Sequence, residues 1–340
     1  MAPVFWLLMV LLCFIIRRSE ILVFSRFGTA SRVNTRQLLR LLLSLMPYGV
    51  KVTWKHDHWH CRLRMRVVPL SKLQTEILLI LAEHRNPESY VAGASALNQN
   101  GPRYSGDIDI FHDQEEAVAQ SAIADTALLV EHGFTFSWIR REPGIYGAIV
   151  QRGGESTKLE WVRDSDFRFF PTIRDELFGY RLHVADLATN KALAAAGRDE
   201  PRDVLDLLYI HEQHLPLGAV IWAAVTKDPG YSPESLITEI RRNARYRQDD
   251  YADLDLVEPV DASVVSQKLR EALRAAETFI RTMPGGKEGL LFLKGSVPVQ
   301  PDPDNLAVYV EHAGRRRGYW PSSSEIGSAM LHLDVKKQKQ

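Results

Sequence analysis

The chain has 340 residues, of which 45% are hydrophobic, 25% are charged and 9% are aromatic. This length suits one large or two ordinary domains with a sizeable core, and these fractions exclude collagen-like, low-complexity and wholly disordered proteins. The two cysteines, Cys13 and Cys61, are too few for a disulfide framework or a four-thiolate zinc site.

The formal net charge of zero hides an asymmetry along the chain. Residues 1–66 contain eleven Lys or Arg and two Asp or Glu, whereas residues 67–340 contain 31 and 40. The balances of +9 and −9 indicate either two segments of different origin or a basic N-terminal arm attached to an acidic body.

The extension begins with an uncharged apolar run over residues 2–16, which Arg17 and Arg18 follow. As a helix this run would rise about 22 Å, less than the roughly 30 Å hydrocarbon core of a membrane. The positive charges follow the run, whereas a secretory signal peptide carries them before it. Three interpretations stay open: a membrane anchor, a basic arm, or upstream sequence wrongly joined to a chain whose ordinary patterning begins after Met65.

Three histidines, His56, His58 and His60, alternate within the extension. In a strand they would share one face, and three such donors can hold a metal ion. No second element near them supplies a fourth ligand, so a structural zinc site is not favoured.

After residue 66 the hydrophobic pattern becomes that of a globular protein. Residues 71–85 are predicted to form an amphipathic helix with Ser71 as its N-cap. Further strands are predicted over 90–92, 107–111, 134–138, 145–151 and 159–162, and further helices over 117–131, 185–196 and 204–211. These elements predict a mixed sheet with helices.

Beyond Pro216 the chain is predicted to be mostly helical, over about 218–226, 233–247 and 263–282. A Pro-Gly-Gly break at 284–286 then precedes a predicted hairpin over 289–300. The expected organisation is an extension (1–66), a mixed-sheet domain (67–215), a helical domain (216–283), and a small C-terminal β appendage with a polar tail (284–340).

Two aspartates lie two residues apart in the predicted strand 107–111. Side chains at this spacing point to the same side of a strand, so Asp107 and Asp109 project together while Ile108 and Ile110 enter the core. Two convergent carboxylates provide the hard oxygen ligands that Mg²⁺ requires, with positions left for triphosphate oxygens. An Asp-x-Asp pair alone is common in surface strands, so neighbouring motifs decide its meaning.

A Gly-Ala-Ser sequence at residues 93–95 follows the predicted strand 90–92. Gly93 permits close backbone approach, and Ser95 at a strand-to-helix turn presents amides and a hydroxyl to phosphate. A third carboxylate on a neighbouring strand would complete a metal site, and alternation places Lys158 and Glu160 on one face of their strand. The alternative is that Glu160 is a solvated residue at a sheet edge.

The predicted helix around Lys191 and the helix after it carry further charges. Lys191 precedes an apolar face and could reach a triphosphate as a point charge. Arg198 and Arg202 could hold phosphate as well. Alternatively, these arginines pair with Asp203 and Asp206 in an ion-pair cluster between the helices.

Together, these motifs make residues 70–247 resemble the AbiEii/AbiGii toxin family of nucleotidyltransferases, which includes the MenT-type toxins. The resemblance lies in the order and spacing of the pieces. They are Leu70-Ser71-x-Leu73-Gln74, Val91-Ala92-Gly93-Ala94-Ser95-Ala96-Leu97, Arg103-x-Ser105-x-Asp107-Ile108-Asp109-Ile110-Phe111, the strand with Glu160, Lys191-Ala192-Leu193, Arg198, Arg202-Asp203-x-x-Asp206-Leu207 and Lys227-Asp228-Pro229-Gly230-Tyr231.

The resemblance implies an α+β polymerase-β-like nucleotidyltransferase fold, in which a mixed sheet precedes a helical half. The resemblance implies transfer of NMP from an NTP co-substrate to an acceptor, with tRNA as the favoured acceptor. It also implies Mg²⁺ or Mn²⁺ as cofactor and a cognate antitoxin protein as partner. The implied catalytic and metal-binding residues are Asp107, Asp109 and Glu160. The implied nucleotide-binding residues are Gly93, Ser95, Lys191, Arg198 and Asp203, of which Asp203 orients Lys191 or Arg198.

The chain departs from the family pattern at Ala94, where a second glycine is common, and at Glu160, where many relatives have aspartate. Besides a tRNA-modifying toxin, we consider a nucleotidyltransferase of small molecules and a nucleotide-binding module without catalysis. A cytoplasmic location is expected unless the apolar run is a real anchor. An RNA track of arginines would favour the toxin, and its candidates are Arg140, Arg141, Arg163, Arg168, Arg174 and Arg181. The alternative is a solvated face, which is the commoner role of arginines scattered through acidic sequence.

Overall fold

The computed structural model of the protein describes residues 21–24, 30–33 and 70–320. The chain divides into two compact units, Met1–Val68 and Pro69–Gln340. In the first unit, β1 (Ile21–Phe24) pairs antiparallel with β2 (Ala30–Val33).

The predictions for the apolar run 2–16 and for His56, His58 and His60 concern residues outside the described part of the chain. No helix within that described part is both long and apolar enough to span a membrane.

A seven-stranded mixed sheet forms the centre of the second unit, in the order β5-β6-β7-β4-β3-β10-β9. Its strands are β3 (Ser89–Ala92), β4 (Asp107–His112), β5 (Thr135–Glu142), β6 (Ile145–Arg152), β7 (Glu155–Arg163), β9 (Ile173–Asp175) and β10 (Gly179–Arg181). Strand β4 runs parallel to β7 and antiparallel to β3. The strand that carries the two aspartates and the strand that carries Glu160 are therefore neighbours inside the sheet.

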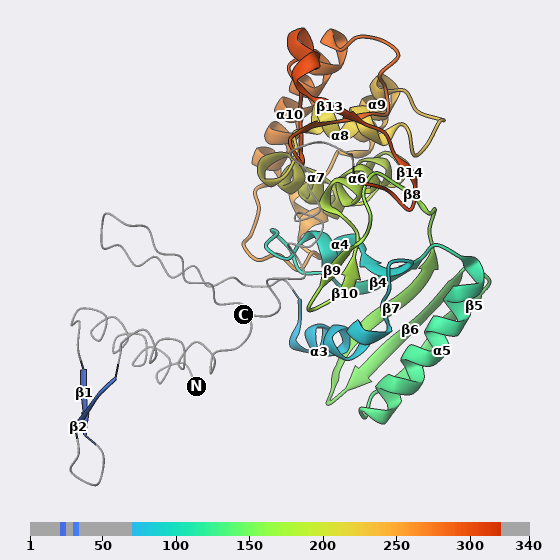
Figure 1. Ribbon diagram of the computed structural model, residues 1–340, viewed down its shortest axis with the longest axis vertical. Helices are drawn as coiled ribbons and strands as arrows, with labels where there is room; N and C mark the ends of the chain where they lie inside the picture. The colour runs from blue at the N-terminus through green and yellow to red at the C-terminus, as the bar shows by residue number, and fades with distance from the viewer. Residues whose placement is uncertain (1–20, 25–29, 34–69, 321–340) are drawn as a thin grey trace. The chain divides into compact units, whose positions relative to one another are not determined.

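One face of the sheet packs on two helices, α5 (Glu115–Glu131) and α3 (Lys72–Leu81), as Figure 1 shows. The Trp161 indole on β7 is fully buried and donates a hydrogen bond of 2.7 Å to Asp125 of α5. Side chains alternate along a strand, so the neighbouring Glu160 points to the opposite face, as do Asp107 and Asp109.

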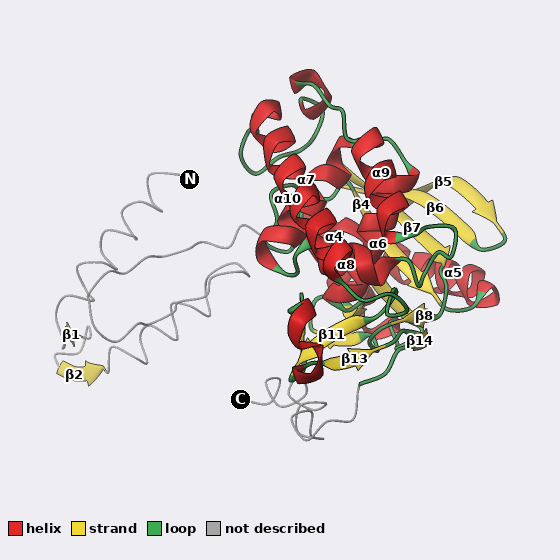
Figure 2. Ribbon diagram, turned by 90° about the horizontal axis from the view of Figure 1, so that it is seen from above, coloured by secondary structure: helices red, strands yellow, loops and turns green. Residues whose placement is uncertain are grey.

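The helical half follows the sheet in the sequence (Figure 2). Its helices are α6 (Val184–Gly197), α7 (Pro201–Gln213), α8 (Leu217–Ala224), α9 (Pro233–Asn243) and α10 (Ala262–Thr282), and the short α4 (Gly93–Leu97) lies between β3 and β4 in the chain. Every residue of α8 is buried, which explains why this helix lacks a polar face. Helix α6 contacts α7, α8 and α9 and so holds Lys191 inside this half.

The C-terminal part forms a small sheet in the order β12-β11-β13, from β11 (Leu291–Lys294), β12 (Val297–Val299) and β13 (Val310–His312). The following β14 (Arg315–Arg316) pairs with β8 (Phe167–Arg168), and the His312 ring bonds the Phe169 carbonyl oxygen at 2.8 Å. The described part of the chain also has three 3₁₀ turns: η1 (Ala82–His84), η2 (Gln248–Tyr251) and η3 (Pro303–Val308).

The predicted α+β class, with a mixed sheet, a helical half and a small β appendage, is confirmed. Ser71 is the N-cap of α3, and its hydroxyl accepts a hydrogen bond from the Gln74 amide in a capping box. Helix α9 ends at Asn243, before the predicted residue 247, and there the Asn243 side chain donates to the Ala196 carbonyl at the end of α6. The two- and three-residue strands β8, β9, β10, β13 and β14 were not predicted, because such short segments carry no periodic pattern.

Candidate functional site

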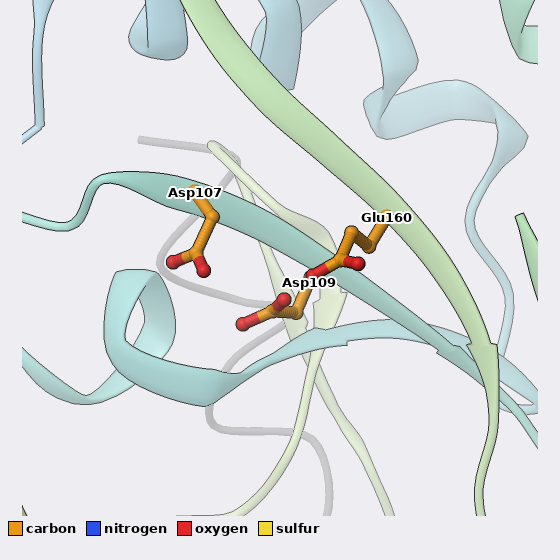
Figure 3. A group of neighbouring side chains, drawn as sticks. All are labelled: Asp107, Asp109 and Glu160. Atoms are coloured by element: carbon orange, nitrogen blue, oxygen red, sulfur yellow. The ribbon is translucent and has the colours of Figure 1, made fainter. Parts of the chain in front are cut away.

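Three carboxylates meet on the sheet face opposite α5. Asp107, Asp109 and Glu160 each offer an oxygen, and these oxygens all lie within 4.8 Å of one another. Asp109 of β4 is directly in register with Glu160 of the parallel strand β7, and Figure 3 shows the three side chains converging from these two strands. The tertiary structure thus brings together residues that are about fifty positions apart in the sequence.

Gly93 makes room for one of these carboxylates. Its φ is +70°, a left-handed conformation that glycine adopts without strain. A Cβ atom on Gly93 would lie 2.1 Å from Oδ2 of Asp109, which is far inside van der Waals contact. Glycine at this position is therefore explained by the approach of Asp109, a contact that the sequence analysis did not predict.

The carboxylate cluster concentrates more negative charge than its surroundings stabilise. Burial, reinforced by the charges of Asp107 and Glu160, raises the pKa of Asp109 from 3.8 to about 7, although Lys191 and Lys158 act in the opposite direction. Three close carboxylate oxygens form the donor set that Mg²⁺ and Mn²⁺ prefer. The residues present therefore fit a divalent cation.

Lys158 is a member of this site that sequence reasoning did not assign. Its Nζ lies 2.8 Å from Oε1 of Glu160, and its backbone is in register with Asp107. The signal that could have found it was the alternation that places Lys158 and Glu160 on one face of the same strand.

A second group of buried charges surrounds Lys191 on α6. The Lys191 ammonium lies 2.7 Å from Asp206 and 3.4 Å from Asp203, both on α7. Arg103, from the loop before β4, donates two hydrogen bonds of 2.9 and 2.7 Å to Asp206. Although burial alone would raise it, the pKa of Asp206 is held well below its ordinary value by Lys191 and Arg103. Asp206, which Arg103 holds in place, thus fixes the position of Lys191.

Asp203 connects this group to Arg198. Its carboxylate accepts hydrogen bonds of 2.6 and 2.9 Å from the Arg198 guanidinium, and its other contact is with Lys191. Arg202 lies elsewhere, 3.4 Å from Glu200. Arg198 thus pairs with Asp203, as the ion-pair alternative has it, whereas among the ion pairs of the described residues Arg202 reaches neither Asp203 nor Asp206. Lys191 and Arg103 complete the cluster.

The hydroxyl of Ser95 is turned inward. Ser95 is 1% exposed, and its Oγ donates to the Ala92 carbonyl oxygen at 3.2 Å, across the turn from β3 to α4. Ala94 is also buried. A different serine, Ser105, contacts the cluster, because its hydroxyl bonds the Asp107 carbonyl oxygen at 2.8 Å and lies 3.3 Å from its carboxylate.

The predicted arginine track is wrong at Arg168, which is 2% exposed and bonded to Asp113 at 2.7 and 3.0 Å. Arg181 is paired with Asp175 at 2.9 Å. Arg141 lies over the Trp138 ring. Sequence alone does not distinguish arginines that pair within the fold from arginines on a free surface, because arginines of both kinds occur beside aromatic and acidic residues.

No protein family matches the chain, and no curated protein matches it either. Among solved structures, it is similar to a candidate nucleotidyltransferase from H. pylori, with 15% identity and a TM-score of 0.40 over 62% of this chain and 94% of that one. It is also similar to MenT4, a nucleotidyltransferase toxin from Mycobacterium tuberculosis H37Rv, with 18% identity and a TM-score of 0.45 over 60% and 82%.

A third similar structure is Cid1, an RNA terminal uridylyl transferase, with 9% identity and a TM-score of 0.25 over 79% of this chain and 87% of that one. All three TM-scores lie below 0.5.

Proposed function

We propose that the protein is a nucleotidyltransferase, which transfers a nucleoside monophosphate from an NTP to an acceptor hydroxyl. The acceptor oxygen forms a bond to the α-phosphorus, the bond between the α- and β-phosphates breaks, and pyrophosphate leaves. The observation that supports this most strongly is the convergence of Asp107, Asp109 and Glu160 from two adjacent parallel strands.

Asp107, Asp109 and Glu160 would hold Mg²⁺ or Mn²⁺. Bound there, such ions neutralise charge on the triphosphate and acidify the acceptor hydroxyl. The Glu160 side chain is 21% exposed. We assign to its carboxylate the removal of the acceptor proton, because an incoming hydroxyl reaches this side chain from solvent.

Charged side chains of α6 and of the turn that follows it would bind the triphosphate. Lys191 and Arg198 supply positive charge, and Asp203 orients both of them. These side chains are already held in place by Asp206 and Asp203, so little further ordering is required when a nucleotide binds. Gly93 and Ser95 shape the turn beside Asp109.

For the acceptor we propose tRNA, and for the biological role a toxin that is held in check by a cognate antitoxin protein. Both follow from the family resemblance of residues 70–247, in which the MenT-type toxins act on tRNA acceptor ends.

The test incubates the purified full-length chain with each NTP, labelled at the α-phosphate, together with Mg²⁺ and total tRNA. Label in tRNA supports the whole proposal. Label only in small solutes keeps nucleotidyl transfer and refutes the tRNA acceptor. Absence of transfer and of pyrophosphate release with every NTP, in a sample shown to be folded, refutes the activity. The Asp107→Asn variant is the control for contaminating enzymes.

A further inference from the structure

Lys158 lies beside the carboxylate cluster, although its ammonium group cannot bind a metal ion. It faces Asp107 across the β4–β7 pair, and its Nζ is 2.8 Å from Oε1 of Glu160. Its charge also acts on Asp109. One cation carried by the chain itself therefore already neutralises part of the charge of Glu160 and Asp109.

This cation is not locked in place. The Lys158 side chain is 38% exposed, and Glu160 is its only ion-pair partner among the contacts of the described residues. Lys191 differs, because it is buried between Asp203 and Asp206. An exposed lysine has four flexible bonds and is readily solvated, so Lys158 can leave Glu160 without breaking a buried network.

We propose that Lys158 is a tethered counter-cation, whose ammonium neutralises the carboxylate cluster in the metal-free protein and must leave Glu160 when a divalent ion binds there. This inference rests on the proposed function. A free divalent ion meets repulsion from Lys158 in addition to competition for Glu160. A complex of the ion with an NTP has a net negative charge and meets no such repulsion. Lys158 thereby favours loading of the metal together with the nucleotide over loading of the metal alone.

The test compares Mn²⁺ binding to the full-length wild type and to Lys158→Met by calorimetric titration at pH 8. We expect Lys158→Met to bind free Mn²⁺ about three- to tenfold more tightly, the range for losing a competing, partly exposed ion pair. Lys158→Arg keeps the charge and should stay within about twofold of the wild type. The matched control is Lys268→Met, which removes a lysine paired with Glu212 at 2.9 Å on the surface of the helical half and should leave Mn²⁺ binding unchanged.

Two further measurements separate charge competition from a structural effect. In the Glu160→Gln background, Lys158→Met should tighten Mn²⁺ binding less than it does in the wild type, because the shared partner is gone and only the repulsion of the ion by Lys158 remains. With a non-hydrolysable NTP present, Lys158→Met should gain less affinity for Mn²⁺ than it gains without nucleotide.

The outcomes distinguish this inference from the proposed function. If the wild type binds Mn²⁺ and Lys158→Met binds it equally or more weakly, the inference is overturned while the proposed function stands. If Lys158→Arg behaves like Lys158→Met, charge is not the cause and the inference is likewise overturned. If the wild type itself binds no Mn²⁺, both the metal assignment and the inference fall.

Discussion

The replacement Asp109→Asn tests the electrostatics of the site most directly. Asn has nearly the same shape as Asp but remains neutral at every pH. It removes one of three crowded charges and one candidate metal ligand. We therefore expect a variant that is more stable without metal, insensitive to metal, and at least about a hundredfold slower in nucleotidyl transfer.

The expected gain in stability follows from the pKa of Asp109, which burial and the neighbouring carboxylates raise from 3.8 to about 7. Because the pKa of Asp109 is raised in the folded state, its protonation stabilises the folded protein. This contribution is present in full below about pH 4 and is lost as the pH rises through 7. At about 1.4 kcal/mol per pKa unit, the ionised group at pH 8 destabilises the fold by up to about 4 kcal/mol. Water reaches this partly exposed side chain, so we expect about 2 kcal/mol at pH 8 and about 1 kcal/mol at pH 5.

The assay is urea unfolding of the full-length wild type and of Asp109→Asn, in EDTA and in excess Mn²⁺, at pH 5 and pH 8. In EDTA the variant should be the more stable protein, by a margin that grows with pH. Mn²⁺ at a hundred times its dissociation constant should stabilise the wild type by about 2.7 kcal/mol and the variant hardly at all. The control is Asp253→Asn at an exposed position. If Asp109→Asn is less stable than the wild type in EDTA at pH 8, the three carboxylates do not repel one another and the site is described wrongly.

Three more predictions concern single positions. Gly93→Ala places a Cβ atom 2.1 Å from Asp109 Oδ2, at a backbone φ of +70°. This variant should lose Mn²⁺ binding in titrations, and its unfolding free energy should fall by about 1–2 kcal/mol. Normal metal binding by the variant would contradict this. Asp206→Asn leaves Arg103 and Lys191 without their shared counter-charge and should lower the unfolding free energy by about 3 kcal/mol. The control, Glu212→Gln at the exposed pair with Lys268, should change the unfolding free energy by less than about 1 kcal/mol. Burial lowers the pKa of His183 from 6.5 to about 4. The neutral ring therefore stabilises the fold above pH 6.5, by up to about 3 kcal/mol, and this contribution is lost as the pH falls towards 4. His183→Asn retains an N-cap acceptor for the Ala185 amide and should show a shallower loss of melting temperature in acid; an identical slope would exclude His183 as the cause.

The local pattern of the sequence was enough to predict the long elements and the facing of the two aspartates. Strand alternation fixes which side chains share a face, whatever the strand pairs with, so Asp107 and Asp109 had to diverge from Ile108 and Ile110. Helix α3 was predictable for a similar reason, since its capping box involves only Ser71 and Gln74, three residues apart.

Only the tertiary structure decided which strands and helices meet. The alternative that Glu160 lies at a sheet edge was wrong because β7 lies between β6 and β4, a consequence of pairing between distant segments. The same long-range packing places Lys158 on Glu160, places Asp109 over Gly93, and buries Arg168 against Asp113. A residue's type and spacing predict which chemistry it offers, but its charge partner and its burial depend on contacts that no local pattern encodes.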